Sequence, residues 1–352
     1  MIPSLIYHVD IFGWNVTFLS ALLVDIRELE RFPPLDFIIS ITTVVEMVLL
    51  VFIGLAYLPY FYVVATCSVY HPNLKRIMLL LILNSFLFLF TRFVLILYSF
   101  RYIDRTGDET SDLLLLIAGT VRLACMIVVF AMFPFILTER IFAVIYLWDY
   151  EHKRRTWISS IIIVGSAIVA PIGAIGLSIA VLEIRAFATY FGIPAFLLAM
   201  IGFAWGTGKL SRVNQKTLDD LNRKNCEYGL SAKYQAAENQ RCFGFANKFL
   251  YFSTFSDFFG TGVVIIHVLL YKQPTLNCLI AGAIFEHYST LYPISYLFVS
   301  LYAVEEWRKK YFSIFEPILC GQKIGDTPPE KANINHDQDT KDYFDYYKST
   351  WA

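Results

Sequence analysis

The chain has 352 residues, of which 57% are hydrophobic and only 16% are charged. A water-soluble domain carries about a quarter charged residues and could not enclose this many apolar side chains in one core, so the composition excludes an ordinary soluble protein. Because 29 Lys and Arg balance 29 Asp and Glu, the net charge gives no sign of a nucleic-acid partner.

Seven segments are long and apolar enough to cross a bilayer, which takes about 20 residues of helix. They predict an all-α integral membrane protein, a bundle of seven transmembrane helices between residues 35 and 304. Residues 1–34 precede the bundle, 207–248 form its longest loop, and 305–352 form a polar tail. Within the loop, residues 230–239 have a helical pattern and are expected to extend the sixth helix. In chain order we expect helices at 35–58, 77–100, 112–137, 157–181, 189–205, 249–271 and 278–304.

The distribution of basic residues predicts the orientation. One set of loops and helix ends carries 17 Lys and Arg, and the opposite set carries 6. Basic residues accumulate on the cytoplasmic side, so residues 207–248 and 305–352 are expected in the cytoplasm and residues 1–34 outside a cell membrane. Asn15-Val16-Thr17 is an acceptor triplet for N-glycosylation on that outer side. Cys320 follows the basic cluster of the tail and is a possible acylation site.

Four charged residues lie within the predicted helices at one depth, about 12–16 Å below the outer surface at 1.5 Å per residue. They are Glu46, Arg92, Arg122 and Glu286. Charges inside a membrane face a partner or a cavity, and two interpretations remain open. In one, Arg92 pairs with Glu46 and Arg122 pairs with Glu286 to fix the helix packing. In the other, Arg92 or Arg122 lines an outer pocket and receives an anionic or polar ligand.

Signals of enzymatic chemistry are missing from the sequence. The six histidines form no metal-binding cluster and the six cysteines form no CxxC pair. His267 and His287 lie alone in the last two predicted helices, where we interpret them as hydrogen-bonded core residues. We therefore expect no catalytic residue, no metal and no cofactor.

Two short motifs indicate a conformational switch near the inner ends of the helices. Glu139-Arg140 places an acid beside an arginine at the end of the third helix, where G-protein-coupled receptors hold their inactive-state lock. Pro293 and Tyr296 in the seventh helix have the Pro-x-x-Tyr spacing of rhodopsin-like receptors, with Tyr292 in place of the usual Asn. Proline frees a backbone carbonyl and permits a local bend. We predict that Glu139, Arg140, Pro293 and Tyr296 take part in switching and G-protein coupling.

Longer motifs resemble the nematode serpentine chemoreceptors of class epsilon, the Sre family. Residues 137–143 (LTERIFA) and 148–155 (WDYEHKRR) are similar to the Glu-Arg run and the acidic-basic loop of that family. Residues 228–239 (YGLSAKYQAAEN) look like its third-loop pattern, and residues 306–309 (EWRK) look like its tail. The resemblance extends from the third helix to the tail.

This resemblance implies a seven-helix, GPCR-like chemosensory receptor that binds a small environmental chemical and activates a heterotrimeric G protein. Its partners would then be that ligand, the G protein and membrane lipids, without nucleic acid. The alternative is a ligand-gated ion channel of the inverted seven-helix type used by insect odorant receptors, in which the N-terminus lies inside. A small-molecule transporter is a third possibility, which the lack of an internal repeat disfavours.

Overall fold

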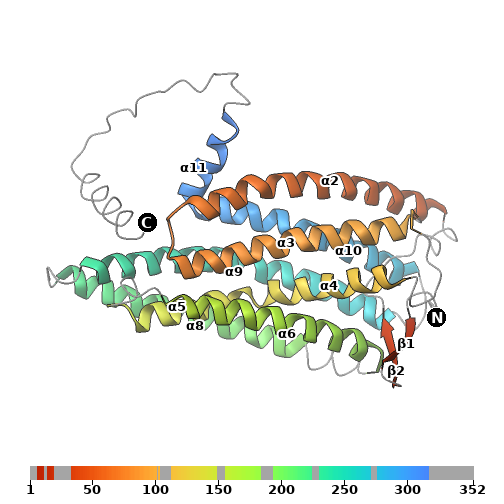
Figure 1. Ribbon diagram of the computed structural model, residues 1–352, viewed down its shortest axis with the longest axis horizontal. Helices are drawn as coiled ribbons and strands as arrows, with labels where there is room; N and C mark the ends of the chain where they lie inside the picture. Colours follow the sequence, from red (N-terminus) through yellow and green to blue (C-terminus); the bar gives the residue numbers. More distant parts are fainter. Residues whose placement is uncertain are drawn as a thin grey trace. The chain divides into compact units, whose positions relative to one another are not determined.

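A computed structural model of the protein describes residues 6–11, 14–19, 33–100, 102–103, 112–148, 155–183, 193–223, 230–270 and 276–316. The chain divides into two compact units, Met1–Tyr311 and Phe312–Ala352. The first unit contains a bundle of long helices (Figure 1). These helices are α2 (Pro33–Thr66), α3 (Pro72–Ser99), α4 (Leu113–Phe130), α5 (Met132–Ile145), α6 (Thr156–Glu183), α8 (Ile193–Arg223), α9 (Leu230–Leu270) and α10 (Leu276–Ala303).

Two further elements flank the bundle in the sequence. A hairpin of β1 (Ile6–Ile11) and β2 (Trp14–Leu19) pairs antiparallel, with Asp10 opposite Asn15. Its second strand contacts α6. The short helix α11 (Glu305–Ser313) directly follows α10. The hairpin was not expected from the sequence, because strands of six residues are too short to give the long apolar signal of a spanning helix.

The third predicted helix is divided in the structure. One helix was expected at 112–137, but α4 ends at Phe130 and α5 begins at Met132, with Ala131 between them. Pro134 lacks the N–H that would bond to the Phe130 carbonyl, and its ring crowds that carbonyl, which explains the break. Beyond it α5 continues to Ile145, so that Glu139 and Arg140 lie within a helix rather than just after one.

Several helices extend beyond their predicted ends. The stretch 207–248, expected as a loop with a helical part only at 230–239, is helical over all of its described residues, because α8 continues to Arg223 and α9 begins at Leu230. The side-chain amide of Asn214 donates to the backbone carbonyl of Ala236 at 2.8 Å, which links the two extensions. Hydropathy marks where a helix leaves the apolar layer, whereas a polar helix can continue when a neighbouring helix packs against it.

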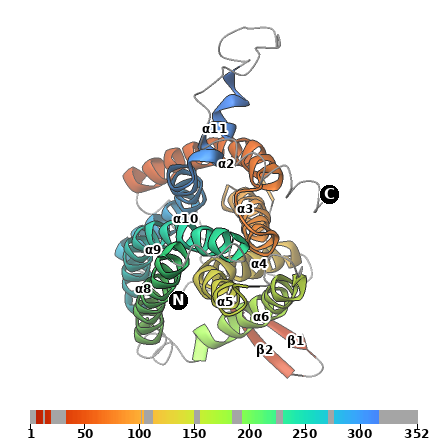
Figure 2. The same ribbon diagram turned by 90° about the vertical axis from the view of Figure 1, so that its left-hand side faces the viewer.

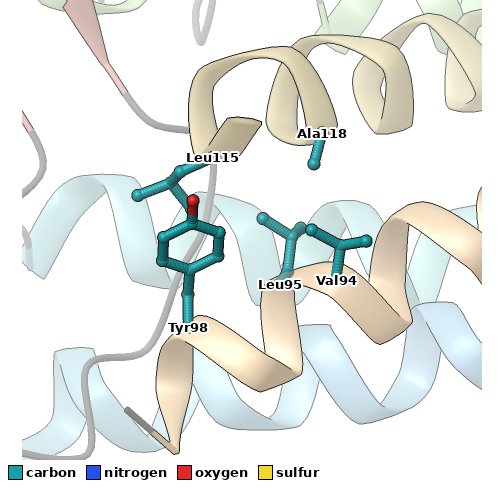
Figure 3. Close-up of a cluster of buried hydrophobic side chains, with 5 residues drawn as sticks. All are labelled: Val94, Leu95, Tyr98, Leu115 and Ala118. Atoms are coloured by element: carbon teal, nitrogen blue, oxygen red, sulfur yellow. The ribbon is translucent and has the colours of Figure 1, made fainter. Parts of the chain in front are cut away.

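The helices pack side by side around α3, which contacts α2, α4, α5, α6 and α10 (Figure 2). One apolar cluster between α3 and α4 consists of Val94, Leu95, Tyr98, Leu115 and Ala118, all less than 9% exposed (Figure 3). Within the described residues, four segments satisfy a length and hydropathy criterion for membrane spans: Pro33–Thr66, Pro72–Ser99, Leu113–Ile145 and Thr156–Gly176. Many apolar side chains on their outward faces are exposed, as expected where lipid is the solvent.

Candidate functional site: two buried arginine networks

The four charged residues predicted at one depth meet in the interior of the bundle. We call Glu46, Arg92, Arg122 and Glu286 the charged layer; each is 2–4% exposed. Arg92 forms a two-pronged pair with Glu46, with Nε donating to Oε1 at 2.6 Å and Nη2 to Oε2 at 2.7 Å. Both Arg92 and Arg122 form ion pairs with Oε2 of Glu286. The layer is therefore one chain of alternating charge, in which Glu286 joins the two arginines across α3, α4 and α10.

Neighbouring polar groups complete this layer. Thr290 donates to Oε1 of Glu46, and Nδ1 of His287 lies 2.7 Å from Oε2 of the same carboxylate. Nη2 of Arg122 donates to the hydroxyl of Ser289 at 2.6 Å. A buried ion pair is tolerated when hydrogen bonds satisfy the donors and acceptors that the pair itself does not use. Polar side chains at consecutive turns of α10 supply these hydrogen bonds.

The second network surrounds Arg140, whose side chain is fully buried. Its Nη2 donates to Oε1 of Glu139 at 2.6 Å, and its Nε pairs with the other oxygen of that carboxylate. Its Nη1 donates to Oδ1 of Asn239 at 2.7 Å and to Sγ of Cys242 at 3.3 Å on α9. We call Glu139, Arg140, Asn239 and Cys242 the Arg140 network. It fastens α5 to α9.

The third-loop motif reaches this network from α9. Gln235 donates to Oδ1 of Asn239 at 3.2 Å, and Oε1 of Glu238 lies 3.8 Å from Nη1 of Arg140. The same Glu238 oxygen accepts from the backbone N–H of His71 at 2.6 Å, just before α3 begins. Gln235, Glu238 and Asn239 lie at helical spacing on one face of α9. The two family-like motifs, LTERIFA and YGLSAKYQAAEN, thus contact each other through Arg140.

Pro293 and Tyr296 lie away from Arg140, among aromatic side chains. The carbonyl oxygen of Pro293 accepts from the Tyr57 hydroxyl at 2.7 Å, and the Tyr296 hydroxyl donates to the sulfur of Met78 at 3.4 Å. The rings of Tyr296 and Phe249 are 5.0 Å apart. Phe249 belongs to α9, two helical turns beyond Cys242. Tyr296 therefore packs against α9, the helix to which the Arg140 side chain is hydrogen-bonded.

Helix α11 has two buried aromatic side chains, Tyr311 and Trp307, of which Trp307 is only 2% exposed. Its ring meets Tyr60, Tyr70 and Phe245 edge to face at centroid distances of 5.5–6.3 Å. Outside the spanning segments, burial raises the pKa of the Tyr70 hydroxyl, which therefore stays neutral. On the exposed face of α11, a hydrogen bond from Lys309 at 3.0 Å lowers the pKa of Glu305.

The structure does not bring the four predicted switch residues together. Glu139 and Arg140 meet each other, whereas Pro293 and Tyr296 form their hydrogen bonds with side chains of α2 and α3. The side chain of Asn15 and all of Cys320 lie outside the described residues.

Several residues of these networks were not singled out from the sequence, among them Cys242, Ser289 and Thr290. Asn239 was noted there only as part of the third-loop motif, and His287 was given no partner. Both belong to sets of polar residues that repeat at helical spacing within α9 and α10. That repeat was the available signal, because polar side chains on one face of an apolar helix indicate a buried polar contact.

Comparison with known proteins places the chain in a family. A family model described as "Sre G protein-coupled chemoreceptor" matches residues 20–352. Serpentine receptor class epsilon-1 of Caenorhabditis elegans is 23% identical over 311 residues, covering 81% of this chain and 83% of that protein. Serpentine receptor class epsilon-8 of the same organism is 22% identical over 320 residues, covering 89% and 88%. The family has a seven-helix membrane fold, which confirms the predicted fold class. The chain therefore belongs to the Sre family of G protein-coupled chemoreceptors.

Proposed function

We propose that this receptor binds a small environmental chemical from the outer side of the cell membrane and activates a heterotrimeric G protein on the inner side. The observation that carries the proposal is the burial of Arg140 between Glu139 and Asn239. An arginine held in this way reaches a partner protein only when α5 and α9 separate. The bonds between the two helices thus define two states, whose populations a ligand can shift.

The charged layer supports the ligand-binding half of the proposal. It joins α2, α3, α4 and α10 through buried charges that are costly to place in a bilayer. A ligand that contacts Arg92, Arg122 or Glu286 would alter the bonds between these helices. Tyr296 on α10 packs against Phe249 on α9. A shift of α10 would therefore displace α9, the helix to which Arg140 is hydrogen-bonded, by direct contact.

Substitution of Arg140 tests the coupling. We expect Arg140→Ala to lose G-protein signalling in response to an odorant library while an N-terminal tag still reports receptor at the cell surface. Arg76→Ala is the control, since Arg76 is exposed on α3 and its loss removes one positive charge without opening the Arg140 network. Normal signalling from surface-expressed Arg140→Ala would overturn the coupling role. An equal loss in both variants would attribute the effect to positive charge in general.

A further inference from the structure

Three lysines on the outside of the bundle lie over aromatic rings that are themselves exposed. They are Lys209 over Trp205, Lys248 over Tyr302 and Lys310 over Tyr62, with Nζ 5.0, 5.0 and 5.4 Å from the ring centroid. We call these six residues the lysine–aromatic pairs. The three rings are 68%, 70% and 53% exposed. Exposed aromatic rings and lysines that extend past them are typical of the level at which a membrane protein passes from lipid to water.

Two of the pairs lie at one level of the bundle, around Trp307. The Trp307 ring meets Phe245 of α9 and Tyr60 of α2 at centroid distances of 6.3 and 6.0 Å. Lys248 follows Phe245 by three residues, and Tyr62 follows Tyr60 by two. The pairs of α9 with α10 and of α11 with α2 therefore lie within about one helical turn of this level.

The third pair reaches the same level from α8. Helices α8 and α9 run antiparallel, with Ser211 accepting from Gln240 at 3.3 Å. Six residues further along each helix, Trp205 of α8 lies opposite Ala246 of α9. Ala246 adjoins Phe245, so all three pairs lie around one level. They occupy one side of the bundle, where α8, α9, α10 and α2 are consecutive neighbours (Figure 2).

Two of these lysines carry positive charge that no described carboxylate offsets. Lys209 and Lys248 are exposed, and neither forms an ion pair with a described residue. The nearest carboxylate of α8, Asp219, is ten residues beyond Lys209, about 15 Å along the helix. On α9, Glu238 accepts from the backbone N–H of His71. A cation held at a lipid–water boundary in this way attracts an anionic group.

The side chain of Lys248 extends toward the end of the bundle that holds the Arg140 network. Tyr296 packs against Phe249, and α10 runs antiparallel to α9. Tyr302 follows Tyr296 by six residues, so it lies more than one helical turn nearer to the N-terminus of α9 than Lys248 does. Nζ of Lys248 reaches the Tyr302 ring only by extending that way, which is how a lysine reaches from apolar surface to the headgroups.

We propose that Lys209 and Lys248 each bind the headgroup of an anionic phospholipid at this end of the bundle. Each Nζ donates to the headgroup, and the acyl chains lie against the exposed ring beside it, Trp205 or Tyr302. Lys310 marks the same boundary, but its Nζ already donates to a threonine of α2. The proposal goes beyond the proposed function, because it involves neither the chemical ligand nor the G protein.

The test measures lipid binding to the purified full-length receptor by native mass spectrometry, without odorant or G protein. The probes are phosphatidylserine, phosphatidylcholine with the same acyl chains, and glycerophosphoserine, which is the first headgroup without acyl chains. We expect the wild type to bind phosphatidylserine about fivefold or more tightly than phosphatidylcholine, a preference that narrows as salt is raised. Lys209→Gln/Lys248→Gln should weaken phosphatidylserine binding about fivefold at each site and leave phosphatidylcholine binding unchanged.

The matched control removes the same charge from the same two helices, further from the boundary. It is Lys216→Gln/Lys233→Gln, whose two lysines are exposed on α8 and α9. Lys216 lies about 10 Å beyond Lys209, and Lys233 lies about 22 Å beyond Lys248. Phosphatidylserine binding should stay within about twofold of the wild type in this control. Lys209→Arg/Lys248→Arg should also keep binding, since a guanidinium binds phosphate as well.

Equal binding of the two phospholipids by the wild type would overturn the proposal, and that comparison requires no variant to fold. So would equal losses in the two double glutamine variants. Glycerophosphoserine that binds as tightly as the whole lipid would show a site for a soluble anion in place of a lipid surface. These outcomes are separate from the proposed function: selective lipid binding with normal signalling by Arg140→Ala would refute the coupling role alone.

Discussion

The guanidinium of Arg140 and the side-chain oxygen of Asn239 lie 2.7 Å apart, although 99 positions separate them in the chain. Arg140 belongs to α5 and Asn239 to the N-terminal part of α9. The bond joins the Glu-Arg motif to the third-loop motif, so the two segments that resemble the Sre family most specifically form a single buried network. Loss of this bond is the change expected to have the largest effect on signalling.

Asn239→Ala should raise ligand-independent signalling. It removes the oxygen acceptor of Arg140 on α9 and keeps Glu139 and the weaker sulfur acceptor of Cys242. The state with α5 and α9 apart should therefore become more populated relative to the state in which they are bonded. A hydrogen bond to a charged group contributes about 1.5–3 kcal/mol, which corresponds to about a tenfold or larger shift in that equilibrium. Basal second-messenger output per surface receptor measures it. Gln240→Ala is the control, since Gln240 bonds to Ser211 and not to Arg140. Unchanged basal output in Asn239→Ala would contradict the role of the Arg140 network in holding the inactive state.

Neutralising one partner of the Glu46–Arg92 pair should destabilise the receptor strongly. Glu46→Ala and Arg92→Ala each remove the two-pronged partner of a buried charge and leave the charged layer with one uncompensated charge, at a cost of about 3–5 kcal/mol in unfolding free energy. The double variant should lose less than the sum of the two. Thermal unfolding of the purified proteins gives all three values. Strict additivity would show that the 2.6 Å and 2.7 Å bonds contribute no coupling.

Trp307→Ala should release α11 from the bundle. Truncating a fully buried tryptophan costs about 3–5 kcal/mol, and Trp307 is the residue of α11 that meets Tyr60, Tyr70 and Phe245. Faster hydrogen exchange in α11 and a lower Tm are the expected results. Trp148→Ala is the matched control, because Trp148 is 63% exposed and its loss should change stability by about 0.5 kcal/mol or less. Equal effects of the two substitutions would show that α11 has no anchor in the aromatic cluster.

The pair of Glu305 and Lys309 should respond to acid. The pKa of Glu305 is lowered by its bond with Lys309. The stabilisation of α11 by this pair is therefore fully present above the unfolded-state pKa of Glu305. It is lost as pH falls below about 4, through the lowered folded-state pKa of the same carboxyl group. Hydrogen exchange in α11, measured against pH for the wild type and Glu305→Gln, checks this. The two proteins should differ slightly near neutral pH and converge in acid; a difference that grows in acid would contradict the assignment.

The proposed orientation predicts the accessibility of both termini. A tag at the N-terminus should bind antibody on intact cells, and a tag after Ala352 should bind only after permeabilisation. Asn15 lies in β2 opposite Asp10, and we expect its glycan to be lost in Asn15→Gln and on glycosidase treatment, both read as a decrease in mass. The reverse tag pattern would favour the inverted channel topology over the receptor topology.

The sequence by itself determined the class of protein and the depth of its charges. Hydropathy is a local property, so apolar segments identify spanning helices without any knowledge of their neighbours. The constant rise per residue likewise placed Glu46, Arg92, Arg122 and Glu286 at one level. The Glu-Arg and third-loop motifs indicated the family, which the family model and the two relatives confirm.

Only the tertiary structure decided which of these groups meet. Spacing along a helix gives a depth, but a contact also depends on how each helix is rotated about its axis and on the rotamer of each long side chain. That is why Glu286 is shared by two arginines rather than paired with one. For the same reason the pairing of Arg140 with Asn239 and Cys242 on α9 could not be predicted from spacing along the chain.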